Sequence, residues 1–253
     1  MDMPVNRLKK ALAAGEKQIG LWSSLCSPIV AEALAYSGYD WLLIDTEHSP
    51  NELPNVMGMM QAMALGTASP VVRPAWNDPV LLKRLLDAGT QSFLIPFVQS
   101  AEEAARAVSA TRYPPEGIRG VALSHRGNRY GRVPDYVKKA NQEICLLVQV
   151  ESRAAVDAAA DIAAVDGVDG VFIGPSDLAA DLGHLGNPGH PEVQAAIAEV
   201  LKACQSAGTA AGILSGIEDQ AKGYLDAGFS FVAVGSDLGL LTKHADALRE
   251  SFK

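Results

Sequence analysis

Two carboxylates, Glu151 and Asp177, follow two consecutive strand-like runs of the sequence. The runs are 144–151 (ICLLVQVE) and 171–177 (VFIGPSD), and a segment of helix length, rich in alanine and aspartate, lies between them. Parallel strands joined by a helix leave the same edge of a sheet, so we expect the two carboxylates to converge there. Converging carboxylates are suited to hold a single cation.

Other strand-like runs end in polar residues as well. In chain order these residues are Asp45, Glu47, His48, Arg73 and Gln149. Side chains alternate along a strand, so Asp45 lies on the same side as Glu47, and Gln149 on the same side as Glu151. Their apolar neighbours suit packing against helices. We therefore expect the polar set to point into one shared site.

Four carboxylates beside one guanidinium, Arg73, leave charge that is costly to bury without compensation. A divalent cation would balance this charge. Oxygen ligands without a thiolate favour magnesium or manganese, with cobalt or zinc as substitutes. The alternative is that Asp45 or Glu47 only bridges Arg73 on the adjacent strand.

Eight short apolar runs alternate with segments of helical periodicity. They are 19–24, 41–45, 70–74, 92–97, 145–150, 170–174, 210–214 and 230–235. Runs that are apolar almost throughout are typical of strands covered on both faces. Eight such units in about 250 residues favour a (β/α)8 TIM barrel over a doubly wound open sheet. In a barrel the functional groups lie at the carboxyl-terminal strand ends, where the polar residues above are found.

The helical segments have recognisable ends. Residues 79–88 carry a leucine stripe and stop at Gly89, while 192–206 and 217–227 stop at Gly208 and Gly228. Residues 3–14 predict an extra amphipathic helix that covers the base of the barrel. The segment 113–134, rich in Gly, Pro and Arg, is too long for an ordinary connection. With no linker elsewhere, we expect a single domain over 1–253.

Composition narrows the classes of partner. The chain has 253 residues and a net charge of -8, which argues against nucleic acid or an anionic membrane as the main partner. Its three cysteines stand in no CxxC spacing, which indicates reduced thiols. No run approaches the roughly 18 apolar residues that a membrane helix needs. We expect a cytoplasmic enzyme.

Several of these stretches resemble the metal-dependent pyruvate aldolases of the HpcH/HpaI family. They are WLLIDTEHSPN at 41–51, PVVRP at 70–74, SATRYPPEGIRGV at 109–121, LLVQVES at 146–152, GVDGVFIGPSDLAADLG at 167–183 and AGFSFVAVGSD at 227–237. The likeness covers nearly the whole chain. One departure is Thr46, which stands where the family often has glycine.

The resemblance implies a role for individual residues. Glu151 and Asp177 match the metal ligands, and Arg73 matches the arginine that contacts the pyruvyl oxygens. His48 with Asp87 matches a pair that activates water as the base. The remaining implied positions are Gln149 and Glu47 near the metal, and the Gly174, Pro175 and Ser176 backbone as a carboxylate cradle. The resemblance also implies a hexamer that exchanges a helix at about 239–252.

These residues predict an aldolase that reversibly cleaves 4-hydroxy-2-oxo acids to pyruvate and an aldehyde, with oxaloacetate decarboxylation as a side activity. None of the eight strand-like runs contains a lysine, which argues against a Schiff-base aldolase. Trp22 and Leu214 are expected at the aldehyde side of the pocket, or as rim packing. The alternatives are a phosphoenolpyruvate-type isomerase or mutase and a keto-acid-binding barrel without turnover.

Overall fold

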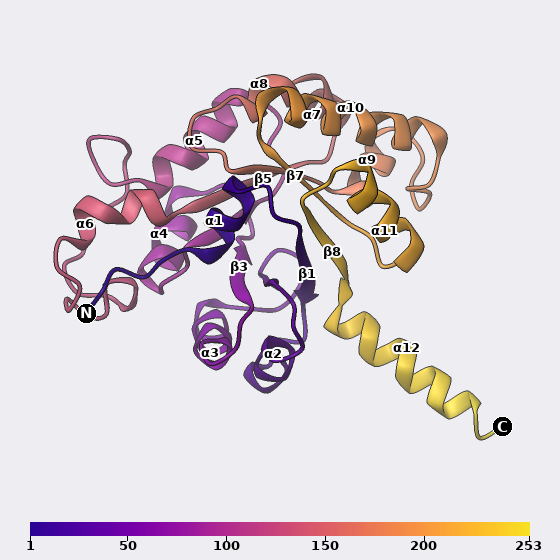
Figure 1. The fold of residues 1–253 in the computed structure, drawn as a ribbon, viewed down its shortest axis with the longest axis horizontal. Helices are drawn as coiled ribbons and strands as arrows, with labels where there is room; N and C mark the ends of the chain where they lie inside the picture. Colours follow the sequence, from indigo (N-terminus) through magenta and orange to yellow (C-terminus); the bar gives the residue numbers. More distant parts are fainter.

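The computed structural model describes residues 1–253, and its centre is a closed barrel of eight parallel strands (Figure 1). Around the barrel these are β1 (Gln18–Ser23), β2 (Trp41–Asp45), β3 (Ser69–Arg73), β4 (Ser92–Ile95), β5 (Cys145–Val150), β6 (Gly170–Ile173), β7 (Ala210–Leu214) and β8 (Phe231–Ser236). Each strand pairs with the next along the chain, and β8 closes the barrel on β1. The predicted (β/α)8 barrel is confirmed, and the open sheet is excluded.

Helices lie between the strands and cover the outside of the barrel. They are α2 (Pro28–Ala35), α3 (Leu53–Met63), α4 (Pro79–Asp87), α5 (Ala101–Thr111), α6 (Tyr136–Lys139), α7 (Arg153–Asp157), α8 (Ala159–Ala163), α9 (Pro175–Asp181), α10 (Pro191–Ala207) and α11 (Glu218–Ala227). As predicted, α10 and α11 end at glycines in the left-handed conformation, Gly208 (φ 72°) and Gly228 (φ 111°). No helix is both long and apolar enough to cross a membrane.

Side chains of β2 alternate between two cores. Leu42 and Ile44 belong to the core between barrel and helices, whereas Trp41 and Leu43 belong to the core inside the barrel. The next inward position is Asp45, at the carboxyl-terminal mouth. The alternation predicted for the polar residues is therefore confirmed on this strand.

Aromatic rings fill the inside of the barrel below the mouth. Trp22 lies 5.5 Å from Phe172 and 6.3 Å from Trp41, measured between ring centroids. Two inward positions must be glycine to make room. A Cβ at Gly20 would lie 2.0 Å from the Trp41 ring, and one at Gly212 would lie 2.2 Å from the Phe231 ring. The mouth thus has a packed floor and opens only at the carboxyl-terminal end.

The extra helix α1 (Arg7–Ala13) closes the opposite end of the barrel. Leu8 and Leu12 pack with the inner core, and Lys9 forms an ion pair of 3.1 Å with Asp169. The prediction of a helix over 3–14 was too long. Asn6 has extended backbone and accepts a hydrogen bond from the Lys9 N–H, so it caps the helix and fixes its start at Arg7.

The strand β4 also ends earlier than predicted, at Ile95 rather than 97. Phe97 has a φ of 52°, in the left-handed region that interrupts a strand. The Phe97 backbone N–H therefore does not continue the strand pairing but points toward the carboxyl-terminal mouth of the barrel.

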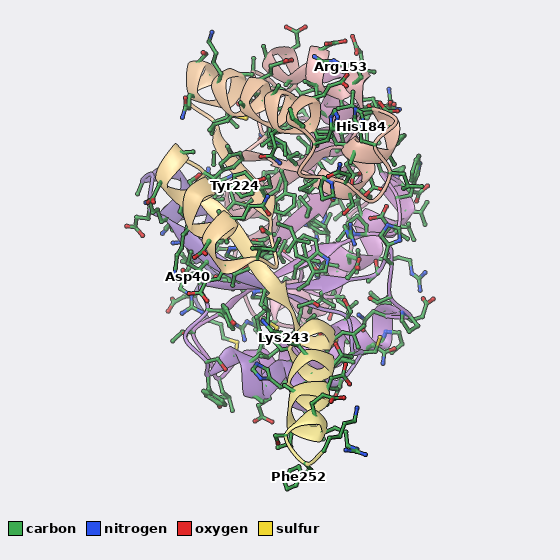
Figure 2. All side chains as sticks on the ribbon, turned by 90° about the vertical axis from the view of Figure 1, so that its right-hand side faces the viewer. Asp40, Arg153, His184, Tyr224, Lys243 and Phe252 are labelled. Carbon is green, nitrogen blue, oxygen red and sulfur yellow. The ribbon has the colours of Figure 1, made fainter.

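The C-terminal helix α12 (Asp237–Glu250) projects away from the barrel (Figures 1 and 2). Figure 2 shows Lys243 along this helix and Phe252 beyond its tip. Several large apolar side chains of this segment are exposed to solvent: Leu238, Leu240, Leu241, Leu248 and Phe252. Apolar side chains that are exposed to water do not stabilise a helix, because most helix stability in proteins comes from packing of its apolar face.

Candidate active site

The candidate site lies at the carboxyl-terminal mouth of the barrel and begins with Arg73 at the end of β3. Its guanidinium forms a two-pronged ion pair with Asp45 of β2, with Nε 2.9 Å from Oδ1 and Nη2 2.7 Å from Oδ2. Both side chains are buried. Although burial opposes the shift, the hydrogen bonds and charge of Arg73 lower the pKa of Asp45 below its ordinary value. The bridging alternative for Asp45 is thus what the structure shows.

The loop after β2 carries Glu47 and His48 to the same place. Asp45 Oδ1 accepts hydrogen bonds from the backbone N–H groups of Glu47 (3.0 Å) and His48 (3.4 Å), which folds the loop over the mouth. Glu47 Oε2 lies 2.8 Å from Arg73 Nη1. The His48 side chain is 67% exposed, and its Nε2 lies 3.9 Å from Glu47 Oε2. His48 therefore has a free imidazole at the opening.

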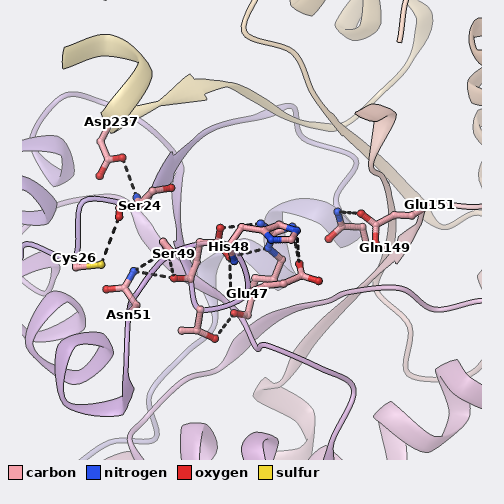
Figure 3. Close-up of polar contacts among 12 residues, drawn as sticks. Ser24, Cys26, Glu47, His48, Ser49, Asn51, Gln149, Glu151 and Asp237 are labelled. Atoms are coloured by element: carbon pink, nitrogen blue, oxygen red, sulfur yellow. Dashed lines mark hydrogen bonds and ion pairs between the residues drawn. The ribbon is translucent and has the colours of Figure 1, made fainter. Parts of the chain in front are cut away.

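Gln149 and Glu151 lie across the mouth, at the end of β5 (Figure 3). Gln149 Nε2 donates a hydrogen bond of 2.6 Å to Glu151 Oε1, and the Phe97 N–H donates one of 3.1 Å to Glu151 Oε2. Each oxygen of the buried Glu151 carboxylate thus has one donor. The strained backbone at Phe97 supplies the second of these bonds, which sequence reasoning missed.

The β6–α9 turn brings Gly174 against this carboxylate. A Cβ at Gly174 would lie 2.4 Å from Glu151 Oε1 and 3.0 Å from Gln149 Nε2, so only glycine allows this approach. Pro175 begins α9, and Ser176 and Asp177 follow in its exposed first turn. No side chain caps this helix start.

The site has an excess of negative charge. Burial, together with the carboxylates of Asp177 and Glu47, raises the pKa of Glu151 to about 8. Burial also raises the pKa of Glu47, despite Arg73. Gln149 Oε1 is buried without a hydrogen-bond donor, and the buried Glu47 Oε2 has its ion pair with Arg73 but no aligned hydrogen bond. These are the features of an oxygen-rich site that fits a divalent cation and its water molecules.

The expected pocket residues Trp22 and Leu214 lie below the mouth. Trp22 is buried, and the Arg73 guanidinium lies 5.3 Å from its ring centroid. Leu214 is partly buried against the inner core. Both side chains border the inner core beneath the polar groups.

The predicted pairing of His48 with Asp87 does not form within one chain. Asp87 is the last residue of α4, which runs back from the mouth, so it lies near the amino-terminal strand ends. Its Oδ1 lies 3.2 Å from Arg119 Nη2 and 3.9 Å from His125 Nδ1. Arg119 and His125 belong to the segment 113–134, which is folded over α4 rather than extended.

Two other groups were not assigned from the sequence. Asp237 accepts hydrogen bonds from Ser23 Oγ (3.0 Å) and the Ser24 N–H (2.8 Å), so it fastens the β1–α2 loop to α12 (Figure 3). Asp237 directly follows a strand and the helix cap Ser236, and this position could have indicated from the sequence that it lies at the mouth. His184 and His190 stack at 3.4 Å between ring centroids, and His184 Nε2 lies 2.8 Å from Glu192 Oε2.

Comparison with known proteins places these residues in a family context. A family model described as HpcH/HpaI aldolase/citrate lyase matches residues 18–244. A 4-hydroxy-2-oxo-heptane-1,7-dioate aldolase of Klebsiella pneumoniae is 56% identical over 98% of this chain and 94% of that protein. A 5-keto-4-deoxy-D-glucarate aldolase of an Enterobacter species is 52% identical over 100% and 98%, respectively.

Solved structures show the same fold. An HpcH/HpaI aldolase/citrate lyase family protein from Burkholderia cenocepacia superposes with a TM-score of 0.95 at 44% identity, covering 98% of this chain and 100% of that one. An HpcH/HpaI aldolase from Desulfitobacterium hafniense gives 0.92 at 30% identity, covering 97% and 96%. The barrel and the family resemblance are both confirmed.

Proposed function

The chain belongs to the HpcH/HpaI aldolase/citrate lyase family, and on that premise we propose that its mouth cleaves a 4-hydroxy-2-oxo acid reversibly into pyruvate and an aldehyde. It is a carbon–carbon lyase of a family that depends on a divalent metal. This assignment leaves no support for the isomerase, mutase and non-catalytic alternatives.

Glu151 and Asp177 would hold the cation, which we propose to be magnesium or manganese. A hard cation takes few protein carboxylates and keeps positions for water and substrate. Gln149 Oε1, which lacks a donor, suits a hydrogen bond from such a water molecule, and Glu47 Oε2 could accept another beside its ion pair with Arg73. When bound, the cation polarises a carbonyl oxygen and offsets negative charge that develops on it.

Arg73 would stabilise the same developing charge from the other side of the mouth. Two of its five N–H groups bind Asp45, and Glu47 lies beside a third, so N–H groups remain for the pyruvyl oxygens. The substrate carboxylate would lie at the uncapped start of α9, formed by Gly174, Pro175 and Ser176. The Gly174 N–H is bonded to the Val150 carbonyl and Pro175 has no N–H, so the free backbone N–H of Ser176 in the first turn would bind the anion.

His48 would serve as the base, directly or through water. His48 would take the proton from the C4 hydroxyl, and C4 would become the aldehyde carbon as the C3–C4 bond breaks. The electron pair of that bond would form the enolate of pyruvate. Protonation of C3 then completes pyruvate. The imidazole of His48 is exposed at the mouth, where it can accept this proton directly or through water.

Asp87 can assist His48 only from a neighbouring subunit, because the two residues lie at opposite ends of one barrel. We therefore propose an oligomer, a hexamer by family resemblance, in which Asp87 of one copy approaches His48 of another. The exposed leucines of α12 support an assembly in which this helix packs on a neighbouring copy.

The aldehyde would bind above Trp22 and Leu214. The substrates in the names of both relatives, a heptanedioate and a glucarate, carry a second carboxylate. We propose that the aldehyde released here carries one as well.

The observation that carries the proposal is the buried Glu151 carboxylate, which accepts hydrogen bonds from Gln149 and the Phe97 N–H and whose pKa is raised by burial and by the carboxylates of Asp177 and Glu47. Removing divalent ions should abolish pyruvate release from a 4-hydroxy-2-oxo acid, and magnesium or manganese should restore it. Borohydride added during turnover should trap no adduct. Full activity in metal-free protein, or a pyruvyl-lysine adduct in the mass spectrum, would contradict the metal-dependent mechanism.

A further inference from the structure

A cavity of about 430 Å³ lies at the end of the barrel opposite the candidate site. Its wall includes Ser69 and Ser92, the first residues of β3 and β4. The segment before α1 and the loop that contains Arg126 and Arg129 form other parts of the wall. Cavities of this size are typical of small-molecule sites.

The charge of this cavity differs from that of the whole chain. Its lining contains three arginines, Arg7, Arg126 and Arg129, and neither Asp nor Glu. The net charge of the protein is -8. None of the three arginines forms an ion pair, although many exposed cations elsewhere do, such as Lys222 with Glu218. Three cations without a counter-charge therefore line one cavity.

Arg126 is built into the wall rather than free in solvent. Its Nη1 donates a hydrogen bond of 2.8 Å to the Ala88 carbonyl. A Cβ at Gly89 would lie 2.6 Å from that same Nη1, and Gly89 has a φ of 101°, so glycine is needed here for both conformation and space. Burial, with Arg129 nearby, lowers the pKa of Arg126 from its ordinary value. An anion beside Arg126 would relieve this unfavourable environment.

We propose that this cavity binds a small, multiply charged anion with forked oxygens, a class that includes dicarboxylates and inorganic phosphate. Arginine binds such groups through two parallel N–H donors. The Tyr130 ring at the rim and the serine hydroxyls offer further contacts. This site lies at the opposite end of the barrel from the mouth of the same chain, and its proposal does not require the aldolase reaction.

Titration calorimetry on the assembled, metal-loaded protein tests this proposal. Saturating pyruvate occupies the mouth, and the probes are succinate, phosphate and, as an uncharged control, succinamide. We expect succinate, phosphate or both to bind with a Kd of about 1 mM or tighter at low salt, more weakly as salt is added, and succinamide not to bind.

The variant Arg7→Gln/Arg129→Gln removes two exposed cations of the lining and should raise that Kd about tenfold or more. Arg126→Gln provides a second test at the half-buried position and should also raise that Kd. The control Arg106→Gln/Lys202→Gln removes two exposed cations on α5 and α10, and should leave the Kd unchanged. Binding of succinate alone would assign the site to carboxylates, and binding of phosphate alone to phosphates. No heat with either anion at about 10 mM, equal binding of succinamide, or equal Kd values in both double variants would overturn the proposal.

Discussion

At the scale of single residues, Arg73 both maintains the structure and faces the proposed substrate. We expect Arg73→Ala to lower kcat by about two orders of magnitude or more, because a charged contact to the enolate oxygen is lost. The same change leaves the buried Asp45 without its partner, so the melting temperature should also fall.

Arg73→Lys separates these two effects. Lysine keeps the positive charge but lacks the planar fork, so it should restore thermal stability more completely than kcat. Near-normal turnover in folded Arg73→Ala protein, established by steady-state kinetics and circular dichroism, would remove Arg73 from the mechanism.

Glu151 gives a prediction of pH dependence. Its pKa of about 8 means that a cation must displace a proton at neutral pH. Manganese affinity, measured by calorimetry, should therefore rise about tenfold per pH unit between about pH 6 and 8 and then level off. Asp177→Asn should weaken binding and move the levelling-off to lower pH, because it removes a charge that raises the pKa of Glu151. An affinity that does not change with pH across that range would contradict the raised pKa.

The stability of the metal-free protein should change with pH in the opposite direction to the metal affinity. Native Glu151 keeps its proton above the ordinary pKa of 4.5, whereas the unfolded chain loses it. The free energy of unfolding of metal-free protein should therefore fall as the pH rises from about 4.5 to about 8.

Residue types and spacing were enough to predict which polar groups meet at the mouth. Asp45, Arg73, Gln149 and Glu151 follow inward strand positions, and period-two alternation fixes their direction. The Phe97 N–H and the close approach of Gly174 could not be predicted in this way, because both depend on backbone conformation in turns. The distance of Asp87 from His48 within one chain follows from chain order, because α4 runs back from the mouth and Asp87 is its last residue.

At the scale of elements, the turn from β6 to α9 packs closely against the carboxylate of Glu151. In Gly174→Ala the new methyl group would lie 2.4 Å from Glu151 Oε1 and force that side chain to move. We expect manganese affinity to fall about tenfold or more, with little change in melting temperature, because the flexible end of Glu151 yields rather than the backbone.

Gly216→Ala is the matched control, since a Cβ at Gly216 meets nothing within 4 Å in the loop after β7. It should leave metal affinity unchanged. Equal affinities in the two variants would show that the approach of Gly174 does not constrain Glu151.

Local backbone conformation also explains why two predicted element boundaries differ from the observed ones. The eight strands were predictable because runs covered on both faces are apolar throughout. The early start predicted for α1 and the late end predicted for β4 failed at Asn6, where a side chain caps the helix, and at Phe97, where φ is positive. Neither feature changes the hydrophobic pattern from which the elements were predicted.

At the scale of the whole molecule, the proposed packing of α12 on a neighbouring copy links assembly to catalysis. Leu241 and Leu248 lie on one face of the helix, 57% and 65% exposed in the single chain. If this face packs on a neighbouring copy, Leu241→Glu/Leu248→Glu should break the oligomer, because two charges would be buried at the contact. Light scattering would then report a smaller particle.

Loss of the oligomer should also lower the rate of aldol cleavage, because Asp87 would no longer reach His48 of another copy. Manganese binding should persist, since Glu151 and Asp177 belong to one chain. By helical periodicity Lys243 lies on the opposite face of α12, and Lys243→Glu makes the same change of net charge, so it should preserve both assembly and rate. If the leucine variant forms stable monomers that cleave substrate at the full rate, then neither α12 nor Asp87 serves a neighbouring subunit, and His48 must act without Asp87.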